Sequence, residues 1–393
     1  MDKKNLLIYG WRGINHSIAL VNQNQLIHLQ NLDDVNVFHM DAPFVNKNWN
    51  ATQNFSGFDH NKQSIINKPV RPDKDLKLDC IYTATYPFDL FHQNKEFFAP
   101  RILNFLVTEF GIYSNDLIDK NLNPRSFLRE ADRIIVPSMW SKNKVIEHGF
   151  LDEFVEIIPH GFDPEIFYPP TLVEKEELKG QIGATKNDYI FLNTGAMTWN
   201  KGIDILVEAF LILRKKYTHI KLVLKDQSNL YGIQAQGIIH QLLTAKPHLN
   251  DNNILDSFII INNNLSLSQL RHLYCAADCY VSPYRAEGFN LTVLEALACG
   301  TDVIVTDGGA TDDFCKNDSI GKIHSLKTSN VELNKSRNYT NNQGHFLEPN
   351  VASLVELMER RINGCSRVHQ HLADMALENF TWQHAVQKLH KLI

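Results

Sequence analysis

Short runs of apolar residues alternate along the chain with longer segments whose apolar positions have a helix-like spacing. In the first half these runs are Leu6–Tyr9, Val35–Met40, Cys80–Thr83, Leu103–Thr108, Ile134–Pro137 and Val155–Pro159, and in the second half they are Tyr189–Thr194, Ile220–Leu224, Phe258–Ile261, Cys279–Ser282 and Val303–Thr306. Strands that are apolar on both faces are typical of parallel sheets covered by helices on both sides. Because strands and helices alternate, right-handed βαβ crossovers are expected. The pattern predicts an α/β protein with two doubly wound parallel sheets.

A polar segment, residues 163–187, separates the two sets of strands. It contains Pro164, Pro169 and Pro170 and then a charged run, which is typical of an interdomain linker leading into a short helix. The chain has 393 residues, enough for two domains of roughly 150–200 residues each. We expect an N-terminal Rossmann-like domain over residues 1–168 and a C-terminal one over residues 169–375. A C-terminal helix over residues 376–393 would then be able to cross back to the N-terminal domain.

Two polar segments interrupt the alternation. Asp41–Lys77 is rich in asparagine, with scattered aromatic residues, and Ser325–His345 is rich in asparagine, serine and lysine. Both predict long loops.

Composition and charge exclude several classes of protein. The net charge of −5 leaves no basic footprint of the kind that a nucleic-acid binder needs. The run Leu6–Tyr9 is too short for a signal peptide, and no run of 18 apolar residues occurs, so we expect a cytoplasmic protein without a transmembrane segment. Six scattered cysteines without a Cys-x-x-Cys pair argue against a zinc site and predict buried free thiols.

The first predicted strand runs into a loop that contains Gly10 and Gly13, and a helical pattern follows. Such a loop lets the backbone approach a ligand and directs the positive end of the helix toward an anion. The two glycines are three residues apart, which does not fit the G-x-G-x-x-G dinucleotide fingerprint. The alternative is an ordinary strand–turn–helix corner.

A pair of carboxylates marks the second half. After the strand that ends at Ser282, Glu287 lies in a glycine-containing loop, and Glu295 lies in the first turns of a helix that Gly300 ends. Both are expected at the carboxyl edge of the sheet, where open α/β folds bind ligands, beside the backbone amides of Asn290–Thr292, which can hold phosphate. Two carboxylates there can accept hydrogen bonds from both ends of a nucleotide sugar. The alternatives are a capping box for Glu295, with Thr292, and a solvated loop position for Glu287.

The segment Glu287–Gly300, with its Glu-x7-Glu spacing, resembles the large retaining glycosyltransferase family typified by sucrose, glycogen and lipopolysaccharide synthases (family 4, GT-B fold). Other segments resemble the same family in the same order: Glu130–Ser138, Ile158–Asp163 followed by Phe167–Pro169, Gly195 with Lys201, Gly202 and Leu206–Phe210, Ala277–Asp278 leading into Tyr280–Pro283, and Phe380–Trp382. The resemblance covers nearly the whole chain and is more specific in the C-terminal half.

The resemblance implies a GT-B fold, with two Rossmann-like domains facing a deep cleft, and metal-independent transfer of a sugar with retention of configuration. Lys201 would contact the donor diphosphate, Glu287 would face the donor sugar and Glu295 would hold the ribose. Gly13 would let its loop approach the diphosphate. The remaining implied donor contacts are Gly288, Phe289, Asn290, Leu291 and Thr292. The implied donor is a nucleotide sugar, a UDP-sugar rather than a GDP-sugar, and no cofactor or metal is implied.

In the N-terminal half, His16 at the start of the first helix and Glu109 after the strand Leu103–Thr108 are candidates for binding the acceptor or the transferring sugar; each has a purely structural alternative. His160, in the linker segment, is interpreted as structural. We also expect Asp41–Lys77 to be mobile without ligand and to form part of the acceptor wall. Its aromatic residues Trp49, Phe55 and Phe58 offer flat faces for a sugar; the alternative is a surface excursion with one or two aromatics tucked inward.

Three departures from the family pattern stand out. Ala196 occupies the place of the usual arginine after the donor-loop glycine, Leu222–Asp226 replaces a glycine-rich turn, and Asn290 stands where glycine is common. Lys225 and Arg285 are candidates to replace the missing arginine. Ala196 also favours an alternative in which the chain is a non-catalytic, sugar-nucleotide-binding partner of a transferase. A nucleotide-sugar epimerase or a phosphorylase on the same scaffold is a further alternative. The acceptor and the oligomeric state are left open.

Overall fold

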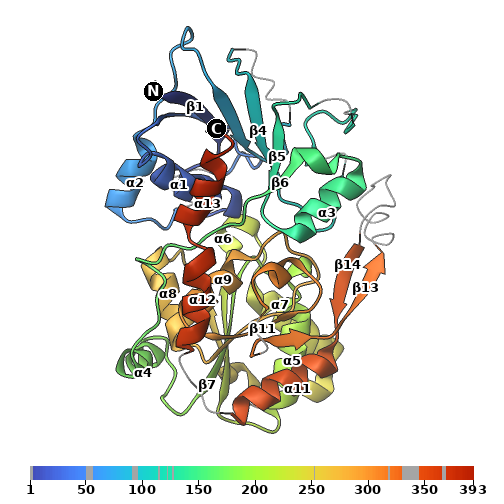
Figure 1. The fold of residues 1–393 in the computed structure, drawn as a ribbon. Coiled ribbons are helices and arrows are strands. Elements are labelled where there is room, and N and C mark those ends of the chain that lie inside the picture. Colours follow the sequence, from blue (N-terminus) through green and yellow to red (C-terminus); the bar gives the residue numbers. More distant parts are fainter. Residues whose placement is uncertain are drawn as a thin grey trace. The chain divides into compact units, whose positions relative to one another are not determined.

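The computed structural model describes residues 3–49, 56–90, 96–113, 116–121, 123–125, 128–251, 253–316, 319–329, 345–364 and 369–393. The chain divides into two compact units. Unit 1 comprises Met1–Gly161, Ser329–His345 and Trp382–Ile393, and unit 2 comprises Phe162–Thr328 and Phe346–Thr381. Each unit has its own parallel sheet with helices around it (Figure 1).

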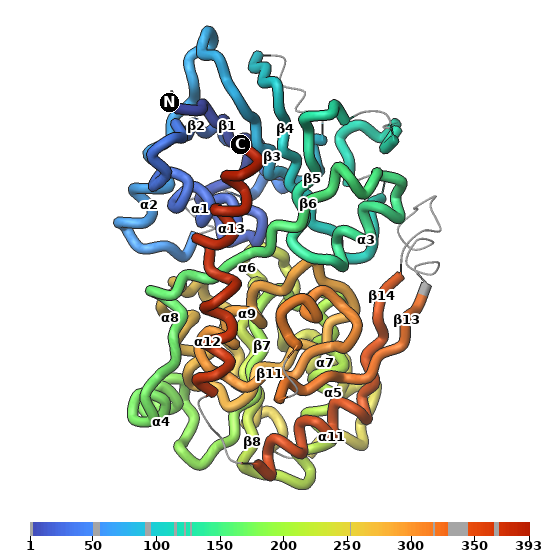
Figure 2. The backbone as a smooth tube through the Cα atoms, in the orientation of Figure 1, coloured from blue at the N-terminus to red at the C-terminus, as the bar shows by residue number. Residues whose placement is uncertain are grey.

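Unit 1 is built on a parallel sheet with the strand order β2-β1-β3-β4-β5-β6. Its strands are β1 (Lys4–Gly10), β2 (Val35–Asp41), β3 (Cys80–Ala84), β4 (Arg101–Phe105), β5 (Arg133–Val136) and β6 (Val155–Ile157). Its helices are α1 (Ser17–Leu29), α2 (His60–Asn67), α3 (Met139–His148) and α13 (Trp382–His390). The tube in Figure 2 follows α13, the last helix of the chain, to its place beside α1, against which it packs. The C-terminal residues therefore complete the unit that the N-terminal residues begin.

Unit 2 repeats this architecture with the strand order β12-β11-β10-β7-β8-β9. Its strands are β7 (Tyr189–Gly195), β8 (Ile220–Asp226), β9 (Phe258–Ile261), β10 (Cys279–Ser282), β11 (Asp302–Thr306) and β12 (Gly321–Ile323). Its helices are α4 (Leu172–Gln181), α5 (Ile203–Arg214), α6 (Ser228–Tyr231), α7 (Ala235–Ala245), α8 (Leu267–Ala276), α9 (Leu291–Ala298), α11 (Val351–Ile362) and α12 (Gln370–Asn379). The predicted pair of doubly wound parallel sheets is therefore confirmed.

Aspartates placed directly before a strand set the register of the neighbouring strand in both units. Each accepts a hydrogen bond from the amide of the second residue of that neighbour: Asp79 from Asn5, Asp132 from Ile102 and Asp278 from Ile190, all at 2.8 Å. Asp278 is fully buried and also pairs with Lys175 and Lys179 of α4, at 3.4 and 2.7 Å. A buried carboxylate is tolerated only when it is paired and hydrogen-bonded in this way. The Ala-Asp segments before β5 and β10 thus have a structural role.

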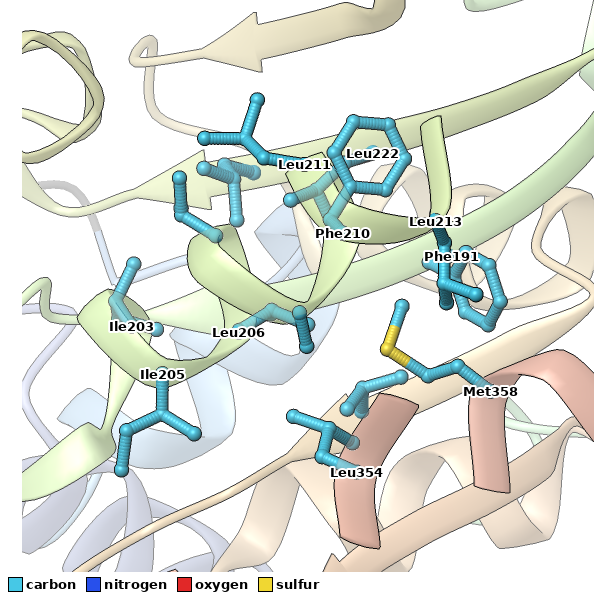
Figure 3. Close-up of a cluster of buried hydrophobic side chains, with 14 of the residues drawn as sticks. Phe191, Ile203, Ile205, Leu206, Phe210, Leu211, Leu213, Leu222, Leu354 and Met358 are labelled. Carbon is cyan, nitrogen blue, oxygen red and sulfur yellow. The ribbon is translucent and has the colours of Figure 1, made fainter. Parts of the chain in front are cut away.

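The core of unit 2 holds the start of α5 in place. Figure 3 shows Leu206, Phe210 and Leu213 of α5 gathered with Phe191 of β7 and Met358 of α11. Burying one such side chain completely is worth about 1.5–3 kcal/mol. Because α5 is apolar along most of its length and packed so tightly, the loop that precedes it has a fixed position.

The structure corrects three details of the sequence prediction. Ser325–His345 is not a loop throughout, because Ser325–Ser329 forms β13, which pairs with β14 (His345–Pro349); residues 330–344 lie outside the described residues. The strand expected at Leu103–Thr108 is β4, Arg101–Phe105. The helix expected over residues 376–393 is interrupted between α12 and α13, where the amide of Phe162 donates to the carbonyl of Phe380 at 2.9 Å.

Candidate active site

The loop after β10 leads into α9 through a left-handed residue. Asn290 has φ 76° and ψ 66°, a conformation that glycine adopts freely and that asparagine tolerates better than most residues. Its side chain holds the turn, since Nδ2 donates to Ser282 Oγ and Oδ1 accepts from Thr292 Oγ1, both at 2.9 Å. Asparagine at a position where the family commonly has glycine is therefore compatible with the fold. The turn directs the first amides of α9, which have no acceptor within the helix, toward the carboxyl edge of the sheet.

Lys201 and Glu287 are brought into direct contact. Lys201 Nζ forms an ion pair with Glu287 Oε1, and the carboxylate is almost completely buried. The two loops are also joined by their backbones, because the amides of Arg285 and Ala286 donate to the carbonyl of Asn200 at 2.7 and 3.3 Å. Glu287 is therefore a paired acid at the loop junction, and the solvated alternative is wrong.

Gly202 is required where these loops meet. It has φ 67°, and a Cβ atom built on it would lie 1.9 Å from the carbonyl oxygen of Pro283. Any other residue would push the Lys201 loop away from the Glu287 loop. The Lys-Gly pair thus supplies a cation and the close backbone approach that positions it.

Arg285 ties three elements of unit 2 together. Its guanidinium binds the carboxylate of Asp204 at 2.8 Å and that of Glu348 at 2.9 Å, and it lies 4.4 Å from the ring centre of Trp199. Lys225 is buried, donates to the carbonyl of Asp226, and has its pKa lowered by burial. Both cations are thus engaged within the protein, which argues against either as a replacement for the arginine missing at Ala196.

Glu295 lies on α9, and its carboxylate is buried. Oε2 accepts a hydrogen bond from the hydroxyl of Tyr274 at 2.7 Å. Burial raises the pKa of Glu295 to about 7, and the hydrogen bond from Tyr274 acts in the opposite direction. The helix begins at Leu291 with Asn290 as its N-cap, and no capping box forms with Thr292. The capping alternative for Glu295 is therefore wrong.

Buried hydroxyls connect Glu295 with the start of α9. Tyr274 contacts Thr194 Oγ1 at 3.2 Å, and the same oxygen lies 3.3 Å from the hydroxyl of Tyr280. Tyr280 in turn donates to Thr292 Oγ1 at 2.7 Å. These contacts link Glu295 to the turn at Asn290, where the first amides of α9 have no acceptor within the helix.

In unit 1, the loop after β1 is held by amide side chains of α1. The Gly13 amide donates to Gln23 Oε1 at 2.9 Å, and Asn22 Nδ2 donates to the carbonyl of Trp11 at 2.8 Å. Gly13 has φ 85°, which explains the glycine. Asn22 and Gln23 were not among the residues predicted from the sequence, although four consecutive amide side chains, residues 22–25, on an otherwise apolar helix were a visible signal.

His16 and Glu109 occupy different parts of unit 1. His16 is the N-cap of α1 and accepts from the amide of Ile18 at 3.2 Å, while burial lowers its pKa to about 4. It is therefore neutral at pH 7. Glu109 follows β4, and its carbonyl accepts from Trp140 Nε1 at 2.7 Å. Since β3 lies between β1 and β4, His16 and Glu109 follow strands that are not neighbours.

His160 is buried between Phe105 and Trp382, in agreement with a structural role.

The aromatic residues of Asp41–Lys77 divide into two groups. The ring of Trp49 lies 5.3 Å from that of His16 and 5.9 Å from that of Trp11. Phe58, by contrast, is only 5% exposed, so its face is not available to a ligand. Phe55 lies outside the described residues. The segment is also not a loop throughout, because it contains α2, which packs against α1.

Cysteines, metal-holding groups and membrane-spanning helices can be assessed only in the part of the chain that the structure describes. Five cysteines, residues 80, 275, 279, 299 and 315, are free and buried; Cys365 lies outside the described residues. Within the described ranges, no group of three or more His, Cys, Asp or Glu side chains is placed to hold a metal ion. In the same part of the chain, no helix combines the length and the apolar character needed to cross a membrane.

Comparison with known proteins finds a family match that lies mostly in the second half of the chain. Residues 174–330 match the model of the family described as glycosyl transferases group 1. The mannosylfructose-phosphate synthase of Agrobacterium fabrum is 26% identical over 182 residues, which cover 46% of this chain and 39% of that protein. The chain thus matches well under two thirds of this relative's length.

Solved structures share the fold across both units. A glycosyltransferase from Rickettsia africae has a TM-score of 0.69 at 12% identity and covers 99% of this chain and 97% of its own. HepE from Anabaena, in complex with UDP-glucose, has a TM-score of 0.66 at 15% identity and covers 98% of each chain. Together with the two Rossmann-like sheets, these likenesses show a GT-B fold. The resemblance drawn from the Glu-x7-Glu segment is confirmed in that residues 174–330 match the model of the glycosyl transferases group 1 family.

Proposed function

We propose that the chain is a retaining, metal-independent glycosyltransferase that takes a sugar from a nucleotide-sugar donor bound by unit 2. The observation that carries the proposal is the ion pair of Lys201 and Glu287 beside the start of α9, with Glu295 buried on that helix. A cation, a helix N-terminus and two carboxylates are the groups that a diphosphate linked to two sugars requires.

Lys201 is the group expected to meet the diphosphate. Its partner Glu287 has no second cationic partner among the described residues, so a diphosphate that engages Lys201 leaves Glu287 to accept hydrogen bonds from hydroxyls of the donor sugar. The amides at the start of α9 add positive potential on the phosphate side. Glu295 is then available to the ribose at the other end of the donor.

The proposed chemistry needs few protein groups. The bond between the sugar C1 and the phosphate oxygen breaks, and a bond between C1 and the acceptor oxygen forms on the same face. The proton of the acceptor hydroxyl moves to the departing phosphate. The contribution of the protein is to position the reactants and to stabilise the charge that develops on the phosphate.

The proposed donor is a UDP-sugar. HepE, which shares the fold, was solved with UDP and with UDP-glucose, and this supports a UDP-sugar as the donor. The likeness does not identify the transferred sugar or the acceptor. For the acceptor side we propose unit 1, with His16, Trp49 and Glu109 as the residues to test first.

The proposal is tested by incubating the full chain with UDP-, GDP- and ADP-sugars and following release of the nucleoside diphosphate. The anomeric configuration of the product is then read by NMR. We expect slow hydrolysis of one donor with retention. Interconversion of the sugar without release of the nucleotide would indicate an epimerase. Binding of a nucleotide sugar without turnover, in the presence of glycan acceptors, would favour the non-catalytic reading that Ala196 suggests.

A further inference from the structure

The hydroxyl of Tyr274 is aimed at the one carboxylate of α9 that the proposed function assigns to nucleotide binding. Tyr274 lies on α8 and is fully buried, and its hydroxyl donates to Glu295 Oε2 at 2.7 Å. Burial and the neighbouring carboxylate raise the pKa of Tyr274 well above its usual value, so the hydroxyl keeps its proton throughout the physiological range. Tyr274 is therefore a permanent donor to Glu295.

The surroundings of the Tyr274 ring fix the direction of this hydrogen bond. The ring meets Phe167 edge-on at 6.1 Å and Tyr280 at 5.7 Å between ring centres. On its other side the hydroxyl contacts Thr194 Oγ1 at 3.2 Å. Because the Tyr274 ring is packed against these aromatic neighbours, its hydroxyl has a fixed position, and the hydrogen bond holds the Glu295 carboxylate beside it.

The charges around Glu295 show why this single hydrogen bond matters. No cation pairs with its carboxylate among the described residues, and the causes of its pKa shift are burial and the bond from Tyr274 alone. The acid is therefore close to its own titration point at neutral pH. A donor that stabilises the charged form decides how much of it is present.

We infer that Tyr274 is a positioning residue for nucleotide-sugar binding: its hydroxyl holds Oε2 of Glu295 and leaves Oε1 to accept hydrogen bonds from a ligand diol. The inference rests on the proposed function, because it assigns to Tyr274 the orientation of an acid that would bind the donor. Tyr274 itself takes no part in the chemistry.

The test uses Tyr274→Phe, which keeps the ring and removes the hydroxyl. UDP-glucose is the main probe, because its diphosphate is esterified at both ends and does not titrate near neutrality; GDP-glucose and ADP-glucose are measured in parallel. At pH 7 we expect about tenfold weaker binding, the usual scale for one hydrogen bond to a charged group. Binding should weaken as the pH falls and Glu295 becomes protonated. In the variant the midpoint of this loss should lie higher, by roughly one pH unit, because the bond that lowers the pKa of Glu295 is gone.

Two controls separate positioning from general damage. Tyr284→Phe removes another fully buried hydroxyl of unit 2, which contacts Thr311 Oγ1 at 2.7 Å and has no contact with Glu295; binding and its pH profile should stay as in the wild type. In the background Glu295→Gln, the change Tyr274→Phe should cost much less affinity than in the wild type, as a double-mutant cycle requires for directly coupled residues.

The outcomes are distinct. If the wild-type chain binds none of the three nucleotide sugars, the proposed function fails and the inference fails with it. If the wild type binds but Tyr274→Phe matches it in affinity and in pH midpoint, only the inference is overturned. A loss of affinity that is equal in the Glu295→Gln background, or equal to that of Tyr284→Phe, also overturns it, because the effect would then be structural.

Discussion

Lys201 and Glu287 form an ion pair between two loops of unit 2 that lie 86 positions apart in the sequence. The pair joins the loop before α5 to the loop before α9, so the cation and the acid of the candidate site are placed by one contact. If a diphosphate is the natural partner of Lys201, the pair is also the contact that ligand binding has to rearrange.

Replacing Lys201 with methionine should therefore remove the preference for phosphate while leaving the nucleoside contacts intact. We expect Lys201→Met to bind UDP tenfold or more weakly, about 1.5 kcal/mol or more for a charge-assisted hydrogen bond. Binding of uridine should not change. Calorimetric titration with both ligands checks this, with Lys216→Met as a control, since Lys216 is an exposed lysine paired with Glu359. Equal losses for UDP and uridine would place Lys201 away from the phosphates.

Substituting Gly202 tests the close approach of the two loops. Gly202→Ala combines a left-handed conformation, which costs about 1–2 kcal/mol, with a clash against Pro283 that adds about 1–3 kcal/mol. Gly232→Ala is the matched control, because Gly232 has φ 75° and open space around the added Cβ. Denaturant unfolding should show a clearly larger loss for Gly202→Ala, and donor binding should fall only in that variant. If the two variants lose the same stability, the clash is not real.

Several strands could be predicted because each depends on a local run of apolar residues. Runs such as Tyr189–Thr194 and Ile220–Leu224 are apolar on both faces, and they became β7 and β8. β13 was not predicted, because Ser325–Ser329 is mostly polar and its partner β14 lies beyond an insertion of 15 residues, 330–344. A strand stabilised by a distant partner rather than by burial leaves no periodic signal.

For the candidate site, the residues could be predicted from the sequence but their contacts could not. The resemblance selected Lys201, Glu287 and Glu295, but the contacts among them could not be read from spacing. Thr292 and Glu295 have the spacing of a capping box, yet the helix begins two residues too early for it, because Asn290, in the left-handed turn, is the N-cap. Tyr274, the partner of Glu295, lies on another helix, and only the tertiary fold brings the two together.

The buried carboxylate predicts an unusual pH dependence of stability. The pKa of Glu295 is about 7 in the folded chain against a usual 4.5, so the folded state holds the proton more tightly. The resulting stability is fully present below about pH 4.5 and is lost as the pH rises through 7, at most about 3 kcal/mol. Glu295→Gln stays neutral, so relative to the wild type it should be more stable at pH 8 than at pH 5. Thermal unfolding at the two pH values checks this, and a pH-independent difference would contradict it.

Removing the Glu295 side chain should affect binding more than folding. We expect Glu295→Ala to weaken nucleotide-sugar binding while the protein remains folded, since no capping box and no ion pair involving Glu295 would be lost within the described residues. Circular dichroism and titration with UDP-glucose measure the two effects separately. Normal binding with a lowered melting temperature would make Glu295 a structural residue.

Activity should persist in excess chelator. The positive charge proposed for the diphosphate comes from Lys201 and from the amides at the start of α9, so the reaction as proposed does not require a divalent ion. The measurement is donor turnover with and without EDTA. Complete loss in EDTA, with recovery on adding Mg²⁺ or Mn²⁺, would contradict the proposed mechanism.

The last prediction concerns Trp49 and the segment Asp41–Lys77. Trp49 lies against His16, at the loop after β1, whereas Phe58 is buried and cannot contact a ligand. If a sugar acceptor stacks on Trp49, Trp49→Ala should reduce transfer several-fold, because an aromatic contact is worth about 0.5–1.5 kcal/mol beyond its buried area. Hydrolysis of the donor should stay within about twofold of the wild type, since unit 2 is proposed to hold the donor.

A matched control for Trp49 is Phe98→Ala, which removes a 77% exposed aromatic ring from another loop of unit 1 and should change neither activity. Shortening residues 50–55 provides a second variant that keeps both α2 and Trp49. A fall in transfer for both Trp49→Ala and the shortened segment, with hydrolysis retained, would assign this segment to the acceptor. If transfer and hydrolysis both stay intact in the two variants, the segment does not bind the acceptor, and His16 and Glu109 become the positions to test.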